Sequence, residues 1–390
     1  MNISSKYKIF FILIVLIILI IPSVRINKNE EFSETEKRNL AKFVPVYNFE
    51  EKTLNRSFGK DFDNWFRDRF FGRIKAVHLN QYLKYMTEGR FAKLNKITID
   101  KKEKFMHETL INPVYSSDVQ SFVYNILNDI NTYCVNNNIK FYIVFNPPKQ
   151  LVYTPPFTVK NGNDKTKEFF QKVNKNNDFN LIFTLDEMLK AKKILPYPVY
   201  FKTDSHPTMD GTFVGYKTLM KAVKKDFPNV KILSENDFDC YQNKLVMVES
   251  ERLFEYGNAC AMAGIPNFLC KNLHDTNYRY YKHKDGKNLK TEIFESDNLI
   301  SKEYYYDKGS DLRIMIFGDS SAENLAEILP YSVKHTKFIR LNGPPNINTK
   351  EEQWKILKYY KNEIAKFNPD IITFYVIWDV SDLKKFSSKK

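Results

Sequence analysis

Short apolar runs alternate with helical patterns along most of the chain, and no other feature constrains its fold as strongly. The runs have the length of strands and carry apolar residues at consecutive positions, which is typical of strands buried on both faces of a sheet. We expect strands at residues 140–145, 181–184, 199–201, 314–317, 337–341 and 371–377. We expect helices at residues 118–135, 165–174, 186–192, 322–329 and 351–367, and one that Thr208 caps. Repeated strand–helix units of this kind predict a three-layer α/β fold around a parallel sheet.

The first residues of the chain differ from the rest. Lys6 and Lys8 precede an unbroken apolar run, Ile9–Ile21, which ends at Pro22. Basic residues before such a run, with no small-residue cleavage site after it, favour an uncleaved signal anchor at residues 1–24 over a removed signal peptide. We therefore expect a single-pass protein of the inner membrane, with a cytoplasmic N-terminus and the rest of the chain in the periplasm. The alternative is a buried core helix.

The chain is expected to fold in three parts. These are the anchor at residues 1–24, a helical extension at residues 25–112 and an α/β domain at residues 113–390. The extension is predicted from aromatic residues that recur every three to four positions between residues 58 and 85. Residues 230–310 interrupt the strand–helix alternation and predict a β-rich insertion. Within it, Asp285-Gly286 is a turn signal that predicts a hairpin of residues 278–281 with residues 290–294.

Composition bounds the partners and the cofactors. The chain carries 60 Lys and Arg against 46 Asp and Glu, a formal net charge of +14, but its lysines are scattered among acids without a nucleic-acid motif. We therefore expect a solvated, lysine-rich surface and no nucleic-acid partner. The four cysteines contain no Cys-x-x-Cys pair and no histidine cluster accompanies them, so no metal site is expected. The sequence leaves open whether Cys260 and Cys270 form a disulfide.

A serine follows one of the predicted strands in a setting that suits catalysis. Gly318-Asp319-Ser320 lies between an apolar run and a helical segment, and this strand–turn–helix context raises a hydroxyl above the carboxyl edge of a sheet. Asp204 and His206 follow the strand expected at residues 199–201, so parallel strands would bring them to the same edge. The three side chains supply a nucleophile, a general base and an orienting carboxylate. Taken singly, each block is more typical of an ordinary turn, loop or helix cap.

Several blocks of the sequence resemble one known family, the SGNH-hydrolase-like O-acetyltransferases of the alginate acetylation type. The shared blocks are residues 36–40, 68–73, 148–153, 200–206 and 317–320. Ordinary SGNH hydrolases carry the serine block first, whereas here the Asp-x-His block precedes it. The resemblance therefore implies a permuted SGNH/flavodoxin-like three-layer sheet, with Ser320 as nucleophile, His206 as base and Asp204 as its partner.

The resemblance also implies a reaction and its participants. It implies transfer of an acetyl group through an acyl-serine to an extracytoplasmic polysaccharide, with the acetyl group delivered by a membrane-bound O-acyltransferase partner. No loop that would cradle the phosphates of a nucleotide or of coenzyme A is evident, so no bound cofactor is expected and the acetyl donor stays unknown. The candidates for oxyanion or substrate binding are Ser321, Asn342, Gly343, Lys149 and Tyr153.

The chain departs from the family pattern at two positions near these residues. Pro207 stands where the family carries a tryptophan, and Ser321 where it carries an aromatic residue. Two alternatives to acetyl transfer therefore stay open. One is an exported carbohydrate esterase that uses the same three residues. The other is a catalytically inactive glycan-binding or assembly protein of the same fold.

Overall fold

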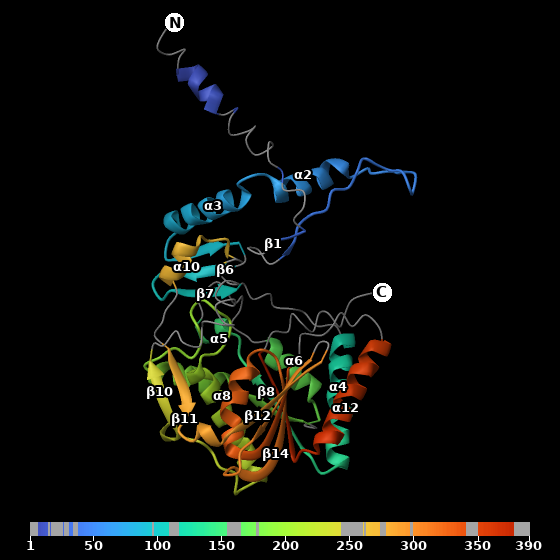
Figure 1. Cartoon of the computed structure of the whole chain (residues 1–390), viewed down its shortest axis with the longest axis vertical. Coiled ribbons are helices and arrows are strands. Elements are labelled where there is room, and N and C mark those ends of the chain that lie inside the picture. The colour runs from blue at the N-terminus through green and yellow to red at the C-terminus, as the bar shows by residue number, and fades with distance from the viewer. Residues whose placement is uncertain are drawn as a thin grey trace. The chain divides into compact units, whose positions relative to one another are not determined.

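Figure 1 shows the computed structural model of the protein. It describes residues 7–14, 16, 26, 31–33, 38–95, 97–108, 117–153, 165–176, 179–242, 260, 263–273, 278–296, 299–340 and 350–377. The chain forms two compact units. The first comprises residues 1–106 and 250–274, and the second comprises residues 107–249 and 275–390.

The second unit is built on a seven-stranded sheet with the strand order β12-β13-β15-β14-β16-β8-β9. Its strands are β8 (Lys140–Asn146), β9 (Asn180–Phe183), β12 (Lys290–Ser296), β13 (Leu299–Tyr305), β14 (Ser310–Gly318), β15 (Val333–Arg340) and β16 (Ile371–Ile377). The five strands from β15 to β9 are parallel, and β13 and β12 extend the sheet in antiparallel fashion. The expected α/β fold with a largely parallel central sheet is therefore confirmed.

Side chains along the central strands alternate between two separate cores. On β14, Ile314 and Ile316 face one core, and Met315 and Phe317 face the other. The first core is closed by α8 (Met209–Asp226) and α11 (Ala322–Ile328), and the second by α4 (Ser117–Asn136), α6 (Lys165–Val173) and α12 (Lys350–Phe367). The helices α4 and α12 lie side by side (Figure 1), joined by an ion pair of Lys361 with Asp129 at 2.7 Å. Because helices cover both faces of the sheet, the unit has three layers.

One predicted strand does not form. The six predicted helices are present as α4, α6, α7 (Leu185–Ile194), α8, α11 and α12, but residues 199–201 make only an isolated bridge between Tyr200 and Pro207. The chain turns back immediately after residue 201, so that the amide of Phe201 donates to the carbonyl of His206 at 3.1 Å. The backbone of this segment therefore pairs with the loop that follows it and not with a strand of the sheet.

The predicted hairpin within residues 230–310 is wrong. Strand β11 (Arg279–His283) pairs with β10 (Phe238–Gln242) in a separate antiparallel sheet, and all seven residues of β12 pair with β13 instead. Residues Gly286–Asn288 form a short 3-10 helix between β11 and β12. The chain does turn at these residues, but the turn leads from one sheet to another, because β10 pairs with β11 and β13 pairs with β12.

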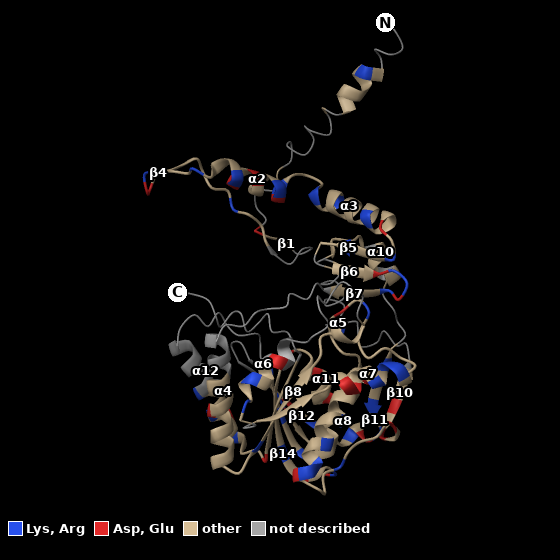
Figure 2. Cartoon of the chain, turned by 180° about the vertical axis from the view of Figure 1, so that it is seen from behind, with Lys and Arg blue, Asp and Glu red and all other residues tan. Residues whose placement is uncertain are grey.

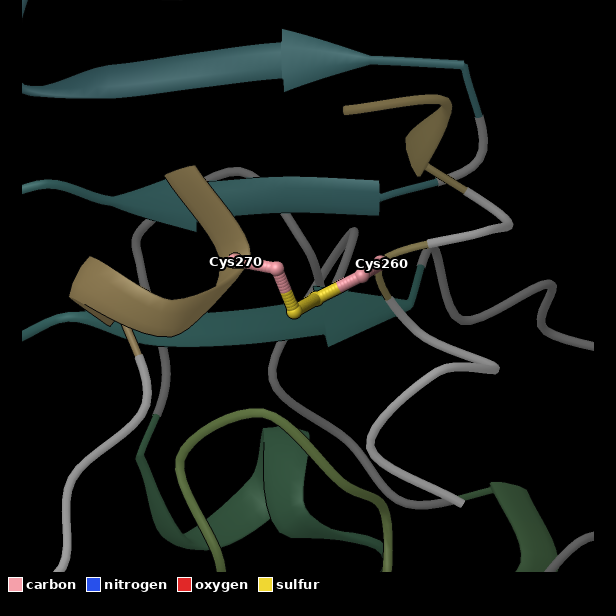
Figure 3. The surroundings of a disulfide bond; sticks show 2 residues. All are labelled: Cys260 and Cys270. Carbon is pink, nitrogen blue, oxygen red and sulfur yellow. A yellow bond between two sulfur atoms is a disulfide. The ribbon is translucent and has the colours of Figure 1, made fainter. Parts of the chain in front are cut away.

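The first unit combines helices with short strands, whereas we expected a helical extension. Its elements are β1 (Phe32–Ser33), β2 (Arg38–Asn39), β3 (Tyr47–Asn48), β4 (Thr53–Leu54), α2 (Phe58–Arg69), α3 (Arg73–Thr87), β5 (Phe91–Leu94), β6 (Ile97–Asp100), the first two residues of β7 (Phe105–Glu108) and α10 (Asn267–Leu273). Its core packs Leu94, Ile97 and Ile99 against residues of α10 and the segment before it. Cys260 and Cys270 form a disulfide in this core, beside the β5–β6–β7 sheet (Figure 3).

Most of the predicted anchor at residues 1–24 lies outside the described residues. Of this segment, residues 7–14 are helical and exposed. Within the described ranges, every helix is too short or too polar to cross a membrane.

Charged residues of both signs share the surface of the second unit. Figure 2 shows Lys and Arg interspersed with Asp and Glu along α7, α8 and the strands β10 and β11. Helix α7 illustrates the mixture, since it begins with Asp186 and Glu187 and ends with Lys192 and Lys193.

Candidate active site

Ser320 lies in a tight turn that only glycine at position 318 permits. Strand β14 ends at Gly318, opposite Tyr375 of the neighbouring strand β16, and α11 begins four residues later at Ala322. A Cβ atom on residue 318 would lie 2.1 Å from the Cβ of Ala322 and 2.7 Å from the carbonyl oxygen of Tyr375. Strand, turn and helix are therefore packed too closely for any side chain, and Ser320 is held at the carboxyl end of a central strand.

Asp319 holds this turn together through its side chain. Its Oδ1 accepts a hydrogen bond from the amide of Ser321 at 2.8 Å and another from the Ser321 hydroxyl. We expected Ser321 to serve at the oxyanion. The structure instead directs the polar groups of Ser321 into the turn, so this residue supports the conformation around Ser320.

Three side chains meet at Ser320 in one chain of hydrogen bonds. The Nε2 atom of His206 lies 2.6 Å from the Oγ of Ser320, and its Nδ1 atom lies 2.6 Å from the Oδ1 of Asp204. The same carboxylate oxygen accepts the backbone amide of His206 at 2.6 Å, which fixes the two residues relative to each other. When Nδ1 carries the proton that Asp204 accepts, Nε2 is free to accept the proton of the Ser320 hydroxyl.

Asp204 is almost fully buried, and its electrostatic state follows from its neighbours. Burial alone would raise the pKa of the Asp204 carboxyl. The hydrogen bond and charge of His206, its backbone amide and the charge of Lys149 outweigh that effect, so the pKa lies below its ordinary value. Asp204 is therefore an anion at neutral pH and can stabilise a positive charge on His206.

The loop that carries Asp204 and His206 is braced from several elements. Thr208 caps α8 by accepting the amide of Gly211 at 3.3 Å and donates to the carbonyl of Pro198 at 2.8 Å. The hydroxyl of Tyr278, just before β11, accepts the amide of Lys202 at 3.0 Å. These contacts close the loop at both ends and hold His206 in place opposite Ser320.

Two residues that we expected at the substrate belong to this bracing instead. Lys149, at the start of the short helix α5 (Lys149–Val152), donates from its buried Nζ to three backbone carbonyls of the loop. The Tyr153 hydroxyl accepts the amide of Val199 at 2.9 Å. The polar atoms of both side chains are thus engaged with the protein. The remaining candidates, Asn342 and Gly343, lie outside the described residues.

One ion pair next to the catalytic loop was not predicted from the sequence. Arg279 of β11 pairs with Asp210 in the first turn of α8, and the hydroxyl of Tyr281 donates to the same carboxylate at 2.9 Å. Asp210 has only 1% of its side chain exposed. No local pattern links residues 69 positions apart, so the sequence offered no signal for this contact. Among the described residues, no group of three or more His, Cys, Asp and Glu side chains is placed to hold a metal ion.

Fold and site together define an α/β protein with a Ser–His–Asp arrangement at the carboxyl end of a parallel strand. No family model matches the sequence, and no curated protein matches it. Among solved structures, Bacillus cereus PatB1 with a sulfonyl adduct is similar at 17% identity, covering 75% of this chain and 97% of its own, with a TM-score of 0.49. A DHHW family protein from Eubacterium siraeum is similar at 12% identity over 77% and 99% of the two chains, with a TM-score of 0.47.

The O-acetyltransferase domain of Pseudomonas putida AlgJ is also similar, at 13% identity over 76% of this chain and 92% of that domain, with a TM-score of 0.42. All three TM-scores lie below 0.5. These likenesses therefore establish neither a family nor an activity for the protein.

Proposed function

We propose that the protein is an O-acetyltransferase that modifies an extracytoplasmic polysaccharide through an acyl-serine at Ser320. The proposal depends on one observation above all, the continuous hydrogen-bond chain from Ser320 through His206 to Asp204, with both contacts at 2.6 Å. The sequence blocks that resemble alginate-type O-acetyltransferases support the choice of an acetyl group and a glycan acceptor.

The reaction would proceed in two half-reactions. His206 takes the proton of Ser320 as Oγ attacks the carbonyl carbon of an acetyl donor, and the tetrahedral intermediate collapses to acetyl-serine when His206 protonates the leaving group. His206 then takes the proton of a sugar hydroxyl, whose oxygen attacks the acetyl-serine and releases Ser320 with its proton restored. Throughout, Asp204 holds the imidazole ring and offsets its positive charge.

The setting of the reaction is part of the proposal. The basic and apolar leader at residues 1–24 supports a membrane-anchored protein whose second unit works outside the cytoplasm. An acetyl group that crosses the membrane requires a carrier, and a membrane-bound O-acyltransferase partner is the donor that the family resemblance implies. We expect neither a nucleic-acid partner nor a resident cofactor.

The test is an assay of the full chain with a chromogenic acetyl ester, with and without an oligosaccharide acceptor. We expect the wild-type protein to release the chromophore, to acquire an acetyl group at Ser320 that mass spectrometry detects, and to pass it to the acceptor. Ser320→Ala and His206→Ala should abolish all three. Ser310→Ala is the matched control, because it removes a hydroxyl at the start of β14 that contacts Lys231 and Asn229 and lies outside the chain of hydrogen bonds.

Each other outcome points to a different protein. Chromophore release without transfer to any acceptor would identify a carbohydrate esterase. A folded wild-type protein that binds glycan, but is as inert as Ser320→Ala, would identify a glycan-binding or assembly protein. Full activity of Ser320→Ala would overturn the role of this serine.

A further inference from the structure

The geometry points to a role for Lys149 that rests on the proposed reaction at Ser320. We propose that Lys149 is a positioning residue of the triad. Its ammonium group holds the Asp204–His206 loop against the start of α5, and its positive charge favours the ionised form of the buried Asp204. In this role Lys149 acts through Asp204 and contacts neither donor nor acceptor.

The first line of support is the convergence of three carbonyls on one ammonium group. The Nζ atom of Lys149 donates to the carbonyl oxygens of Phe201, Lys202 and Asp204 at 3.1, 3.1 and 2.6 Å. An ammonium group has three N–H donors in a tetrahedral arrangement, so three acceptors can match it. Lys149 is 3% exposed, which means that water cannot replace these partners without opening the loop.

The second line of support is the balance of charge inside the site. The carbonyl groups that surround Lys149 are neutral, and a buried ammonium without a nearby anion is strongly disfavoured. Asp204 is the anion of the same loop, and it too is buried. Each charge therefore lowers the free-energy cost of burying the other, and Lys149 contributes to the low pKa of Asp204.

The surroundings of Asp204 identify which groups set its charge. His206 lies on the same loop and Lys149 reaches it from α5. Lys202 also lies on the loop, Tyr278 contacts the loop from the segment before β11, and Asp319 lies in the turn that presents Ser320. Two groups favour the ionised form of Asp204: His206, which contributes more and changes its charge during the reaction, and Lys149, which adds a smaller effect.

The experiment compares Lys149→Met and Lys149→Arg with a matched control, Lys192→Met. Lys192 also donates its Nζ to a backbone carbonyl, that of Val152 at 2.7 Å, which lies outside residues 201–206. We expect Lys149→Met to lower kcat for the acetyl ester by about 100-fold or more with little change in KM, since small displacements of catalytic groups have effects of this size. Lys192→Met should leave kcat near the wild-type value.

The pH profile of kcat/KM distinguishes the effect of the Lys149 charge from the effect of its hydrogen-bond geometry. Loss of a nearby cation makes protonation of the groups around it easier, so the acid limb of kcat/KM should move to higher pH in Lys149→Met. Arginine keeps the charge, but its planar guanidinium cannot match three converging carbonyls. Lys149→Arg should therefore lower kcat while its acid limb stays near the wild-type position. A purely structural lysine would leave the acid limb unmoved in both variants.

A second measurement does not depend on activity. In a double-mutant cycle of unfolding free energies, Lys149→Met should destabilise wild type more than it destabilises Asp204→Asn, and this difference should vanish as the pH falls and Asp204 is protonated. If Lys149→Met does not fold, Lys149→Gln, which removes the charge and keeps two donors, replaces it in both experiments.

The outcomes distinguish this proposal from the proposed function. A wild-type protein without ester activity contradicts the proposed function, while the double-mutant cycle still tests Lys149. Additive effects in the cycle at neutral pH, or a kcat of Lys149→Met equal to that of Lys192→Met, would overturn the role assigned to Lys149.

Discussion

The Oγ atom of Ser320 lies 2.6 Å from Nε2 of His206, although 114 positions separate the two residues. Ser320 follows a central strand of the sheet, and His206 lies in a loop that no strand carries. The contact therefore depends on the elements that brace this loop as much as on the sheet. Mutations can accordingly impair the site in two ways, through the reacting groups or through the bracing.

Asp204→Asn should leave the fold intact and remove most of the activity. An amide at this position can donate to Nδ1 of His206, which favours the tautomer whose Nε2 carries a proton and cannot accept from Ser320. In a serine protease the equivalent change lowers kcat by about 10⁴-fold, and we expect a loss of that order here. Steady-state hydrolysis of an acetyl ester measures it, with circular dichroism as the control for folding. A loss below about tenfold would contradict the role of Asp204.

The low pKa of Asp204 predicts a pH dependence of stability. The ionised carboxylate is favoured in the folded protein, so its contribution is fully present above the unfolded pKa, near 3.8. It is lost as the pH falls through the lower folded pKa. The unfolding free energy of the wild type should therefore fall more steeply than that of Asp204→Asn as the pH decreases below about 4. Denaturant titrations at a series of pH values test this, and parallel curves would contradict it.

Gly318→Ala should disturb the turn that presents Ser320. The new methyl group would overlap the Cβ of Ala322 and the backbone of Tyr375, so β14, β16 or α11 must shift. We expect a loss of about 1–3 kcal/mol in unfolding free energy, as for other overpacked sites, together with a fall in kcat. Gly286→Ala is the control, because its Cβ would meet the nearest atom, the Tyr331 hydroxyl, at an ordinary 3.5 Å. Equal effects of the two changes would show that the close contact at residue 318 is unimportant.

Periodicity in the sequence predicted the layers of the second unit, because consecutive apolar residues and three-to-four spacing report burial directly. Helix α12 and strand β16 start and end close to the positions expected from these patterns. The juxtaposition of Ser320 with Asp204 and His206 was predicted on a premise that is half right: Ser320 does follow a parallel strand, but the strand expected before Asp204 does not form. The chemistry of these residues then indicated their roles.

Strand partners and bracing contacts were not predictable, because they depend on residues far apart in the chain. A turn signal at Asp285 cannot reveal that β11 pairs with β10 and that β12 pairs with β13. Lys149 was recognised as a candidate, but only the three carbonyls around its Nζ show that it serves the loop. Every residue carries a backbone carbonyl, so the sequence does not show which of them accept a hydrogen bond from a side chain.

The disulfide between Cys260 and Cys270 should stabilise the first unit without affecting the reaction. It closes a loop with a sequence separation of 10, for which about 2–3 kcal/mol is expected. Cys260→Ser combined with Cys270→Ser should therefore lower the thermal stability of the first unit, while ester hydrolysis persists because the triad lies in the second unit. Cys240→Ser, at an exposed free cysteine, is the control. A wild-type unfolding transition that does not shift under reducing conditions would contradict this prediction.

Arg279→Met should destabilise the second unit and loosen the start of α8, which follows the loop that carries His206. Asp210 is buried in the first turn of α8, directly after the catalytic loop. Without its guanidinium partner, the Tyr281 hydroxyl is the side-chain donor that remains to it among the described residues. Breaking a buried ion pair on one side costs about 3–5 kcal/mol, and the start of α8 should loosen together with His206.

Arg67→Met is the matched control for this change. Arg67 forms an ion pair with Asp63 at 3.1 Å, but both side chains are more than 60% exposed, and such pairs contribute about 0–1 kcal/mol. Denaturant titration should therefore separate the two variants by at least about 2 kcal/mol, with only Arg279→Met losing ester activity. If the two variants are equally stable, the Asp210–Arg279 pair does not brace α8, and the position of His206 depends on the other bracing residues, Thr208, Tyr278, Lys149 and Tyr153.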